Sequence, residues 1–315
     1  MQTPVTVRRS ARLPGLDLLR LLAILLVTWQ HTAAVLGYYD QTQWRGIEPG
    51  QSSVAIFCAI AGFLAFREVT ASPLQWLKRR LLKIYPAYWI ATLGAFALAI
   101  FFSGKHITVG LFISQMLGTG YFTHGWDLVN VVSWFVSLIL LCYVLAAAAL
   151  WLRRPLLLML LFALIAAALV LTRTEVDLSR HVLAFCLGAV SALVARPLTS
   201  LLFALLLLLI GLTVDIQFCY AAIGLLLLAF CGVVLVREPR WVRTASVYSY
   251  EYFLVHGIFI VGMVQVLGPH AWVIVLALVL ACIGAVVLKF VQQPLTKLLE
   301  PCLLGTGKVR GQTTI

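Results

Sequence analysis

LDLLRLLAILLVTWQHTAAVLG, residues 16–37, decides the fold class of this chain. The stretch is long enough to cross a bilayer as one helix, because a spanning helix needs about 20 mostly apolar residues. It is the first of ten candidate spans, several of which are shorter than twenty residues. All ten are too long and too rich in Leu and Ala to be alternating strands. The other nine are 52–66, 84–103, 131–151, 156–171, 181–195, 198–213, 217–236, 247–267 and 271–291.

The composition excludes the soluble classes of protein. Hydrophobic residues make up 63% of the chain and charged residues only 11%, whereas an ordinary soluble domain has roughly 25% charged residues. A soluble globule, a disordered chain and a basic nucleic-acid binder are therefore excluded, although the net charge is +12. The sequence predicts an all-α, polytopic integral membrane protein of a plasma or inner membrane. It forms one domain over 1–315, with 1–15 and 293–315 as cytoplasmic tails.

The positions of the basic residues predict the topology. If the N-terminus is cytoplasmic, all but four of the 23 Lys and Arg residues fall on the cytoplasmic side. This asymmetry follows the positive-inside rule at every loop, so ten spans with both ends inside are self-consistent. The four exceptions are Arg45, Lys105, Arg173 and Arg180.

Ionisable residues inside a span are costly and suggest function. Arg20 and His31 are eleven residues apart in the first segment, which places them on one helix face about 16 Å apart along the axis. Asp17 precedes Arg20 by three positions and is expected to pair with it. The alternative for this pair is a snorkelling arginine and a hydrogen-bonded core histidine.

A basic stretch precedes the third segment. LKRRLLKIYPAYW, residues 77–89, places Lys78, Arg79, Arg80 and Lys83 together, with Pro86 expected in the first turn of the helix. Cations beside a helix N-terminus suit a phosphate-rich ligand. The alternative is an ordinary interfacial anchor of basic and aromatic residues.

Further polar and aromatic residues are candidates for lining a cavity. Trp134 and Tyr143 lie in the fourth segment, although Trp134 also suits an interfacial belt. Tyr252 and His256 share one face of the ninth segment, which also contains Glu251. The loop 104–130, with His106, His124, Trp126 and Asp127, is either an outward-facing acceptor site or a solvated connection.

Metal and disulfide chemistry are not indicated. The seven cysteines show no CxxC spacing, and six of them lie in apolar runs, so they are expected to be small buried hydrophobes. GxSxG, HExxH and Walker A motifs are absent from the sequence.

Five stretches in order resemble the membrane-bound acyltransferase 3 family. LDLLRLLAILLVTWQH (16–31) is similar to the opening of that family, with its Arg-x10-His spacing. The four later stretches that carry the resemblance are AIFCAIAGFLAFRE (55–68), LKRRLLKIYPAYW (77–89), SWFVSLILLCY (133–143) and SVYSYEYFLVHG (246–257).

The resemblance implies transfer of an acyl group, most often acetyl, from cytoplasmic acyl-coenzyme A to a hydroxyl of a glycan or related acceptor at the far face. His31 would be the essential histidine, with Arg20 and Asp17 beside it. The residues implied to hold the coenzyme are Arg79, Arg80, Lys83 and Tyr85.

Two positions depart from the family pattern. The family's Arg-x-x-Arg motif reads Arg80-Leu-Leu-Lys83 in this chain. The lysine keeps the positive charge but lacks the paired N–H donors with which a guanidinium binds a phosphate. The Glu that many relatives carry after the fourth-span Trp is missing.

The mechanistic hypothesis makes His31, neutral at pH 7 once withdrawn from water, the base that takes the proton of the acceptor hydroxyl. An acyl-histidine intermediate is the other route. Two other functions stay open, a ten-span solute or ion transporter and a catalytically inactive membrane partner from the same family. The acceptor (a polysaccharide, lipid-linked sugar, peptide or metabolite), the acyl length and a homodimeric state are likewise open.

Overall fold

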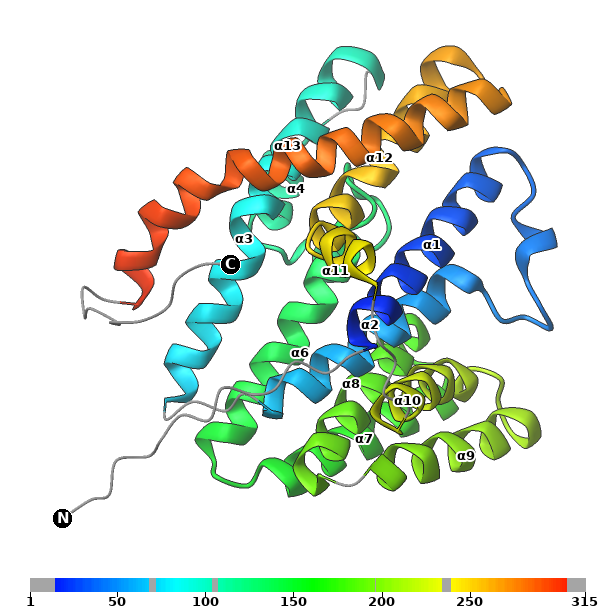
Figure 1. Cartoon of the computed structure of the whole chain (residues 1–315), viewed down its shortest axis with the longest axis vertical. Helices are drawn as coiled ribbons and strands as arrows, with labels where there is room; N and C mark the ends of the chain where they lie inside the picture. The colour runs from blue at the N-terminus through cyan, green and yellow to red at the C-terminus, as the bar shows by residue number, and fades with distance from the viewer. Residues whose placement is uncertain (1–14, 68–71, 104–106, 196, 234–238, 305–315) are drawn as a thin grey trace.

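The computed structural model describes residues 15–67, 72–103, 107–195, 197–233 and 239–304. These residues form helices joined by short connections, and they contain no β-strand (Figure 1). The α-helices are α1 (Leu16–Val35), α2 (Pro49–Arg67), α3 (Pro73–Leu98), α4 (Val109–Met116), α5 (Gly120–His124), α6 (Ser133–Trp151), α7 (Pro155–Leu171), α8 (Val176–Val194), α9 (Pro197–Thr213), α10 (Phe218–Val233), α11 (Arg240–Ser246), α12 (Ser249–Leu267) and α13 (Ala271–Leu304). One 3-10 turn, Asp40–Thr42, and one π-helical turn, Ala99–Ser103, complete the set.

All ten apolar segments predicted from the sequence are helical, in the predicted order. Within the described ranges, seven helices are long and apolar enough to cross a membrane, and three shorter apolar helices correspond to α7, α9 and α10. The protein is therefore an all-α, integral, multi-pass membrane protein. The ten-span count and the cytoplasmic location of both termini stay predictions, and residues 1–14 and 305–315 lie outside the described part.

Helix α3 begins at Pro73 and not at residue 84 as predicted. The side chain of Ser72 caps it, and Pro73 occupies the first turn, where its missing N–H has no consequence. The stretch 77–89 therefore lies inside the helix, with Pro86 in the interior. The prediction that these cations surround a helix N-terminus is wrong. Four cations interrupt the apolar run without interrupting the helix, because Lys and Arg are good helix formers.

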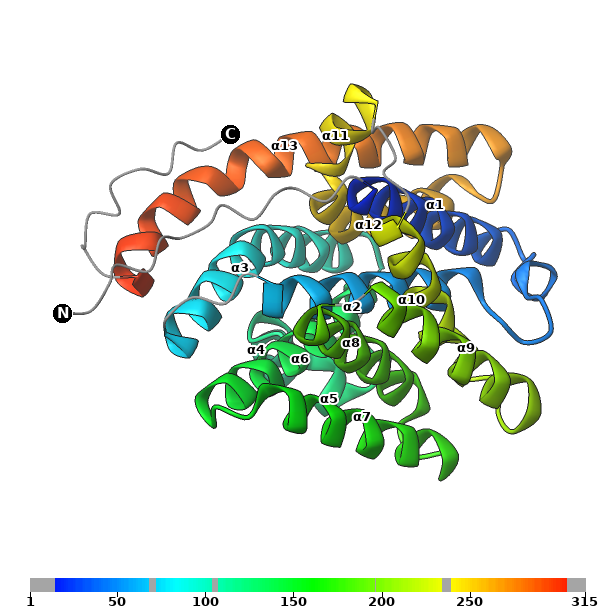
Figure 2. The same ribbon diagram turned by 60° about the horizontal axis from the view of Figure 1, so that its bottom comes forward.

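Helix α13 continues to Leu304, past residue 293, where a tail was predicted to begin. Its 34 residues span about 51 Å at 1.5 Å per residue, more than the hydrocarbon core of about 30 Å. Pro294 and Pro301 lie near its end, where Figure 2 shows the helix bending. The last turns therefore extend beyond the hydrocarbon.

The bundle is organised around α2, which contacts α1, α8 and α10 (Figure 2). Small residues make the closest crossing possible. A Cβ at Gly62 would overlap the carbonyl oxygen of Phe185, and a Cβ at Gly188 would overlap that of Ala59. The backbones of α2 and α8 thus approach through paired glycines, as is common between helices in membranes.

Within the loop predicted at 104–130, residues 109–124 fold back onto the bundle as a re-entrant hairpin. Helix α4 runs antiparallel to α3, because Phe112 makes an edge-to-face contact with Phe96 at 5.1 Å and Trp89 Nε1 donates to the carbonyl of Met116 at 2.8 Å. The Tyr85 hydroxyl donates to the carbonyl of Leu117 at 2.8 Å. Tyr85 lies about 20 Å back along α3 from its far end at 1.5 Å per residue, so the tip of the hairpin reaches the middle of this helix.

The interpretation of 104–130 as a solvated connection is thereby wrong for the hairpin, residues 109–124. His124 contacts the hydroxyl groups of Ser114 and Thr123. His106, the other histidine named for this loop, lies outside the described residues. Irregular backbone is tolerated at membrane depth only where protein or a water-filled cavity surrounds it.

The close crossing of α2 and α8 yields a stability prediction. Gly188→Ala should lower stability by roughly 1–3 kcal/mol, the usual cost of overpacking a tight interface. Gly94→Ala in α3 is the matched control, since nothing lies within 4 Å of a Cβ at that position. Thermal unfolding of the purified protein in detergent measures both; an equal midpoint for the two variants would contradict the packing described.

Candidate active site

A pair of stacked histidines lies between α1 and α12. The ring centroids of His31 and His256 are 5.0 Å apart with an interplanar angle of 27°. His256 is fully buried, whereas His31 is only partly buried. The two rings come from stretches 225 residues apart in the sequence, and their approach places one ionisable side chain against another inside the bundle.

The tautomer of His256 is fixed by its own helix. Its Nδ1 lies 2.7 Å from the carbonyl oxygen of Phe253; because a carbonyl can only accept, Nδ1 is the donor. The Nε2 atom of His256 is buried and has no hydrogen-bond partner. Tyr252 stacks on the same ring at 5.7 Å and 8°, and Thr28, one turn before His31, donates to the Tyr252 hydroxyl at 3.4 Å.

Arg20 and Asp17 form the predicted ion pair at the start of α1. Arg20 Nη1 lies 3.0 Å from Asp17 Oδ1, with side-chain exposures of 33% and 4%. The pairing prediction is confirmed. Arg20 and His31 lie three helical turns apart on one side of α1, so the two ends of the predicted site are at different depths.

The cations of the basic stretch of α3 differ in their contacts. Arg80 donates to the carbonyl of Leu64 at 3.2 Å, and its guanidinium lies over the rings of Trp76 (5.5 Å) and Tyr143 (5.7 Å). The guanidinium of Arg80 therefore connects the basic stretch of α3 to α2 and α6.

The remaining predicted coenzyme ligands are less enclosed. Lys83 is exposed, and Arg79 Nε donates only to the carbonyl of Gln75, at 3.4 Å. The Tyr85 hydroxyl is engaged by the hairpin tip, so its assignment to the coenzyme stays a prediction.

The other cavity candidates have packing partners. Trp134 is buried in an aromatic cluster with Tyr121, Trp126 and His181, with centroid distances from 5.3 to 6.2 Å. It therefore does not stand in an interfacial belt.

Glu251 joins α12 to α13. Its Oε1 accepts from Lys289 at 2.9 Å and from Gln292 at 2.6 Å. The side chain is 2% exposed. These contacts give the carboxylate a structural role in holding the helix that carries His256.

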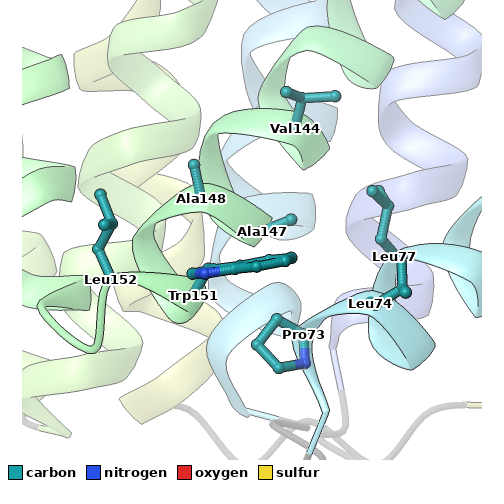
Figure 3. Close-up of a pocket in the computed structure, with 8 residues that line it drawn as sticks. All are labelled: Pro73, Leu74, Leu77, Val144, Ala147, Ala148, Trp151 and Leu152. Carbon is teal, nitrogen blue, oxygen red and sulfur yellow. The ribbon is translucent and has the colours of Figure 1, made fainter.

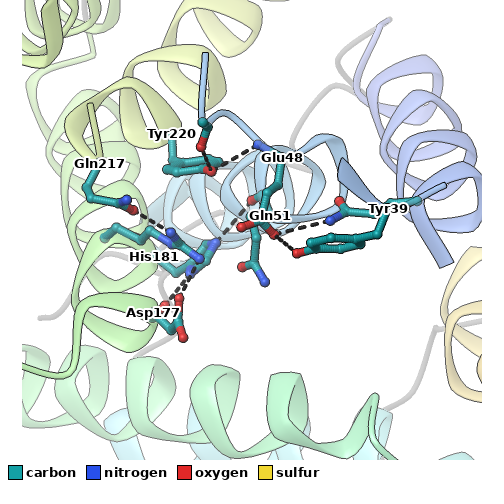
Figure 4. A network of polar contacts seen from close by, with 10 residues as sticks. Tyr39, Glu48, Gln51, Asp177, His181, Gln217 and Tyr220 are labelled. Carbon is teal, nitrogen blue, oxygen red and sulfur yellow. Dashed lines mark hydrogen bonds and ion pairs between the residues drawn. The ribbon is translucent and has the colours of Figure 1, made fainter. Parts of the chain in front are cut away.

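A polar network around His181 was missed from the sequence (Figure 4). The ring nitrogens of His181 face the carbonyl oxygens of Asp177 at 2.5 Å and Gln51 at 3.0 Å. Arg180, only 3% exposed, pairs with the Asp177 carboxylate at 2.6 Å and lies 4.4 Å from the ring of Tyr220. The sequence feature that could have indicated this network is the spacing of Asp177, Arg180 and His181 at the start of an apolar segment.

The same network holds the connection between α1 and α2. The Tyr220 hydroxyl donates to the carbonyl of Gly46 at 3.1 Å, and the Glu48 amide donates to that hydroxyl at 3.0 Å. Tyr39 donates to the Glu48 carboxylate at 2.6 Å. Burial, followed by this bond, raises the pKa of Tyr39 above its usual range. The network thereby fastens α1, α2, α8 and α10 at one end of the bundle.

An apolar pocket of about 410 Å³ opens between α3 and α6, away from the histidine pair (Figure 3). None of the predicted site residues lines it. Its lining residues are Pro73, Leu74, Leu77, Val144, Ala147, Ala148, Trp151 and Leu152.

No group of three or more His, Cys, Asp or Glu side chains suited to a metal ion occurs in the part of the chain that the structure describes.

A family model described as "Acyltransferase domain", that of acyltransferase 3, matches residues 13–290. The chain belongs to the acyltransferase 3 family. No curated protein and no solved structure matches it. The matched region runs from before α1 into α13, so it contains the histidine pair, the Asp17–Arg20 pair and the basic stretch of α3. This acyltransferase therefore presents both groups of predicted site residues within one membrane-embedded domain.

If the basic stretch holds coenzyme A, as the resemblance implies, the different contacts of Arg79 and Arg80 predict different effects on its binding. Arg80→Lys should then weaken binding about 10- to 100-fold, because it removes a planar, stacked guanidinium whose charged hydrogen bonds contribute roughly 1.5–3 kcal/mol. Arg79→Lys, which alters a side chain bonded only to its own helix, should change binding by less than threefold, about 0.6 kcal/mol. Titration calorimetry of each purified variant with coenzyme A measures the difference, and equal losses would contradict the distinction.

Proposed function

We propose that this acyltransferase moves an acetyl group from acyl-coenzyme A, entering at the basic end of α3, to a hydroxyl of a glycan or related acceptor at the opposite face of the membrane. The observation that carries the proposal is the stacked pair of His31 and His256. It places a partly accessible imidazole inside the bundle, three helical turns along α1 from Arg20.

The cations supply a site for the phosphates of the donor. Arg80 lies over the ring of Tyr143, Arg79 and Lys83 lie on the same helix, and Arg20 lies at the start of α1. Arginine suits phosphate because its planar donors match the oxygens in pairs. The separation of about 16 Å along α1 between Arg20 and His31 matches a donor whose charged head stays below while a thin arm reaches the histidine.

His31 then acts as a general base. Its ring takes the proton of the acceptor hydroxyl, and the oxygen attacks the carbonyl carbon of the thioester. The carbon–sulfur bond breaks, and the departing thiolate receives the proton from the imidazolium. Among the described residues none hydrogen-bonds to the ring nitrogens of His31, which keeps this base available. The alternative route, through an acyl-histidine, uses the same ring as a nucleophile.

His31→Ala is the decisive variant for this function. Loss of a positioned general base should lower transfer by about 10²–10⁴-fold. Cells that express each variant are compared for the acetyl mass added to surface glycans and lipids, and purified protein in vesicles is assayed for release of coenzyme A thiol. His270→Ala, which alters an exposed histidine stacked on Trp272, is the matched control and should retain transfer.

The two rival functions give different results in the same experiment. Unchanged transfer by His31→Ala at equal protein levels would remove the mechanism. Flux of a solute without an acyl donor would favour a transporter. A wild-type protein that neither binds coenzyme A nor adds acetyl would be an inactive member of the family.

A further inference from the structure

The apolar pocket between α3 and α6 is a groove on the outside of the bundle (Figure 3). Trp76 on α3 contacts Tyr143 on α6, with ring centroids 5.7 Å apart, and both side chains are buried. The residues that line the groove are more open: Leu74 is 50% exposed, Val144 54% and Trp151 71%. The groove therefore lies on the outer side of the contact between Trp76 and Tyr143, where the bundle faces lipid.

Small residues on α6 create the groove. The side chains of Ala147 and Ala148 end at Cβ, so they leave a hollow in the surface of the helix. The larger Val144 and Trp151 flank this hollow, and the distance between them is about 10 Å along the axis at 1.5 Å per residue. Half of the hydrocarbon core is about 15 Å deep. Because every lining residue is apolar, a hydrocarbon chain can cover the groove without leaving a polar group unpaired.

Two arginines lie at the end of the groove. Arg153 and Arg154 directly follow Leu152, and both are exposed. Within the described ranges, neither side chain has a hydrogen-bond or ion-pair partner. A tryptophan followed by arginines at the end of a helix is typical of the headgroup level of a membrane. The polar head of a lipid whose chain fills the groove would therefore lie beside these two cations.

The backbone at this end of α6 suits glycine better than arginine. The Arg154 amide donates to the carbonyl of Ala149 at 3.3 Å. The Arg153 amide donates to that of Leu150 at 3.2 Å, which completes a Schellman cap. Arg153 is left-handed, with a φ of 55°, where a Cβ is strained and glycine is the usual residue. The variant Arg153→Gly can therefore remove the charge and keep the cap.

The charge around the groove calls for an anion. Lys78 follows Leu77 on the wall formed by α3, and no Asp or Glu occurs in 73–103 or in 133–171. An apolar surface that ends in cations fits an amphiphile with a negatively charged head. Anionic phospholipids have this chemistry, and they attract basic residues near the membrane surface.

The acyl donor is the other amphiphile with phosphate groups. Its transferred carbonyl has to meet His31 inside the bundle, whereas the groove lies on the outer side of the contact between Trp76 and Tyr143. A membrane lipid needs no access to the interior. The geometry therefore favours a phospholipid over the donor.

We infer that the groove between α3 and α6 binds one acyl chain of an anionic phospholipid, whose phosphate lies against Arg153 and Arg154. The bound lipid stabilises the fold, because a ligand that binds only the folded state raises its stability. The inference does not depend on the proposed function, since neither arginine belongs to the histidine pair or to the predicted coenzyme ligands.

Native mass spectrometry of the purified full chain, released from detergent, tests the site. The probes are dioleoyl-phosphatidylglycerol, which is anionic, and dioleoyl-phosphatidylcholine, which has the same chains and no net charge. Wild-type protein should bind one phosphatidylglycerol about tenfold more tightly than one phosphatidylcholine, as expected for two arginines beside the head group. Phosphatidylglycerol should also raise the midpoint of thermal unfolding.

Two variants separate the head group from the chain. Arg153→Gly/Arg154→Gln should abolish the preference for phosphatidylglycerol and keep the thermal midpoint measured without added lipid, because glycine suits the left-handed backbone. Ala148→Phe should weaken the binding of both lipids about tenfold, since the ring fills the groove from an exposed position. Arg240→Gln/Arg243→Gln is the matched control. It removes two exposed arginines of α11, which does not line the groove, and should retain the preference.

Three results would overturn the site: equal affinity of wild-type protein for the two lipids, an unchanged preference in the double variant at Arg153 and Arg154, or unchanged binding by Ala148→Phe. A loss of the preference in the α11 control would also overturn it, because any surface charge would then suffice. Displacement of bound phosphatidylglycerol by palmitoyl-coenzyme A would assign the groove to the acyl donor and overturn the lipid as its occupant. None of these results decides whether transfer requires His31.

Discussion

An ionisable ring inside a hydrocarbon layer has to be matched by another polar group, and the partner that stacks on His31 in this acyltransferase is a second histidine. The constraint extends outward from the pair. His256 is oriented by the carbonyl of Phe253, and α12 is held to α13 by Glu251 and Lys289. The rest of the bundle holds α1 and α12 against each other. The position of the His31 ring therefore depends on contacts made by other helices.

Two features of the packing hold the helices around this pair. The glycines of α2 and α8 bring backbones together and give the bundle a rigid centre. The re-entrant hairpin fills the opposite side and is fastened to α3 by Tyr85, Tyr88 and Trp89. Because its last carbonyls are satisfied by side chains of α3, the chain can turn inside the bundle without exposing backbone groups to lipid.

Hydropathy predicted the ten helices, because each apolar run is longer than expected by chance. A helix also satisfies the hydrogen bonds of its own backbone inside a membrane. Hydropathy failed where charged residues interrupt an apolar run and where a helix is short. The start of α3 was missed because cations interrupt the run, and the hairpin was missed because α4 has only eight residues. The Arg20–Asp17 pair was predictable from spacing along one helix. The stacking of His31 on His256 and the network around His181 were not, since both depend on contacts between distant segments.

A structure of the purified protein with an acetyl-coenzyme A analogue, whose thioester sulfur is replaced by a methylene group, tests the central claim most directly. The account predicts that the acyl carbonyl lies in contact with the His31 ring and that the phosphates lie against Arg80 and Arg20. An acyl group seated in the apolar pocket between α3 and α6, or anywhere that leaves the histidine pair untouched, would contradict it.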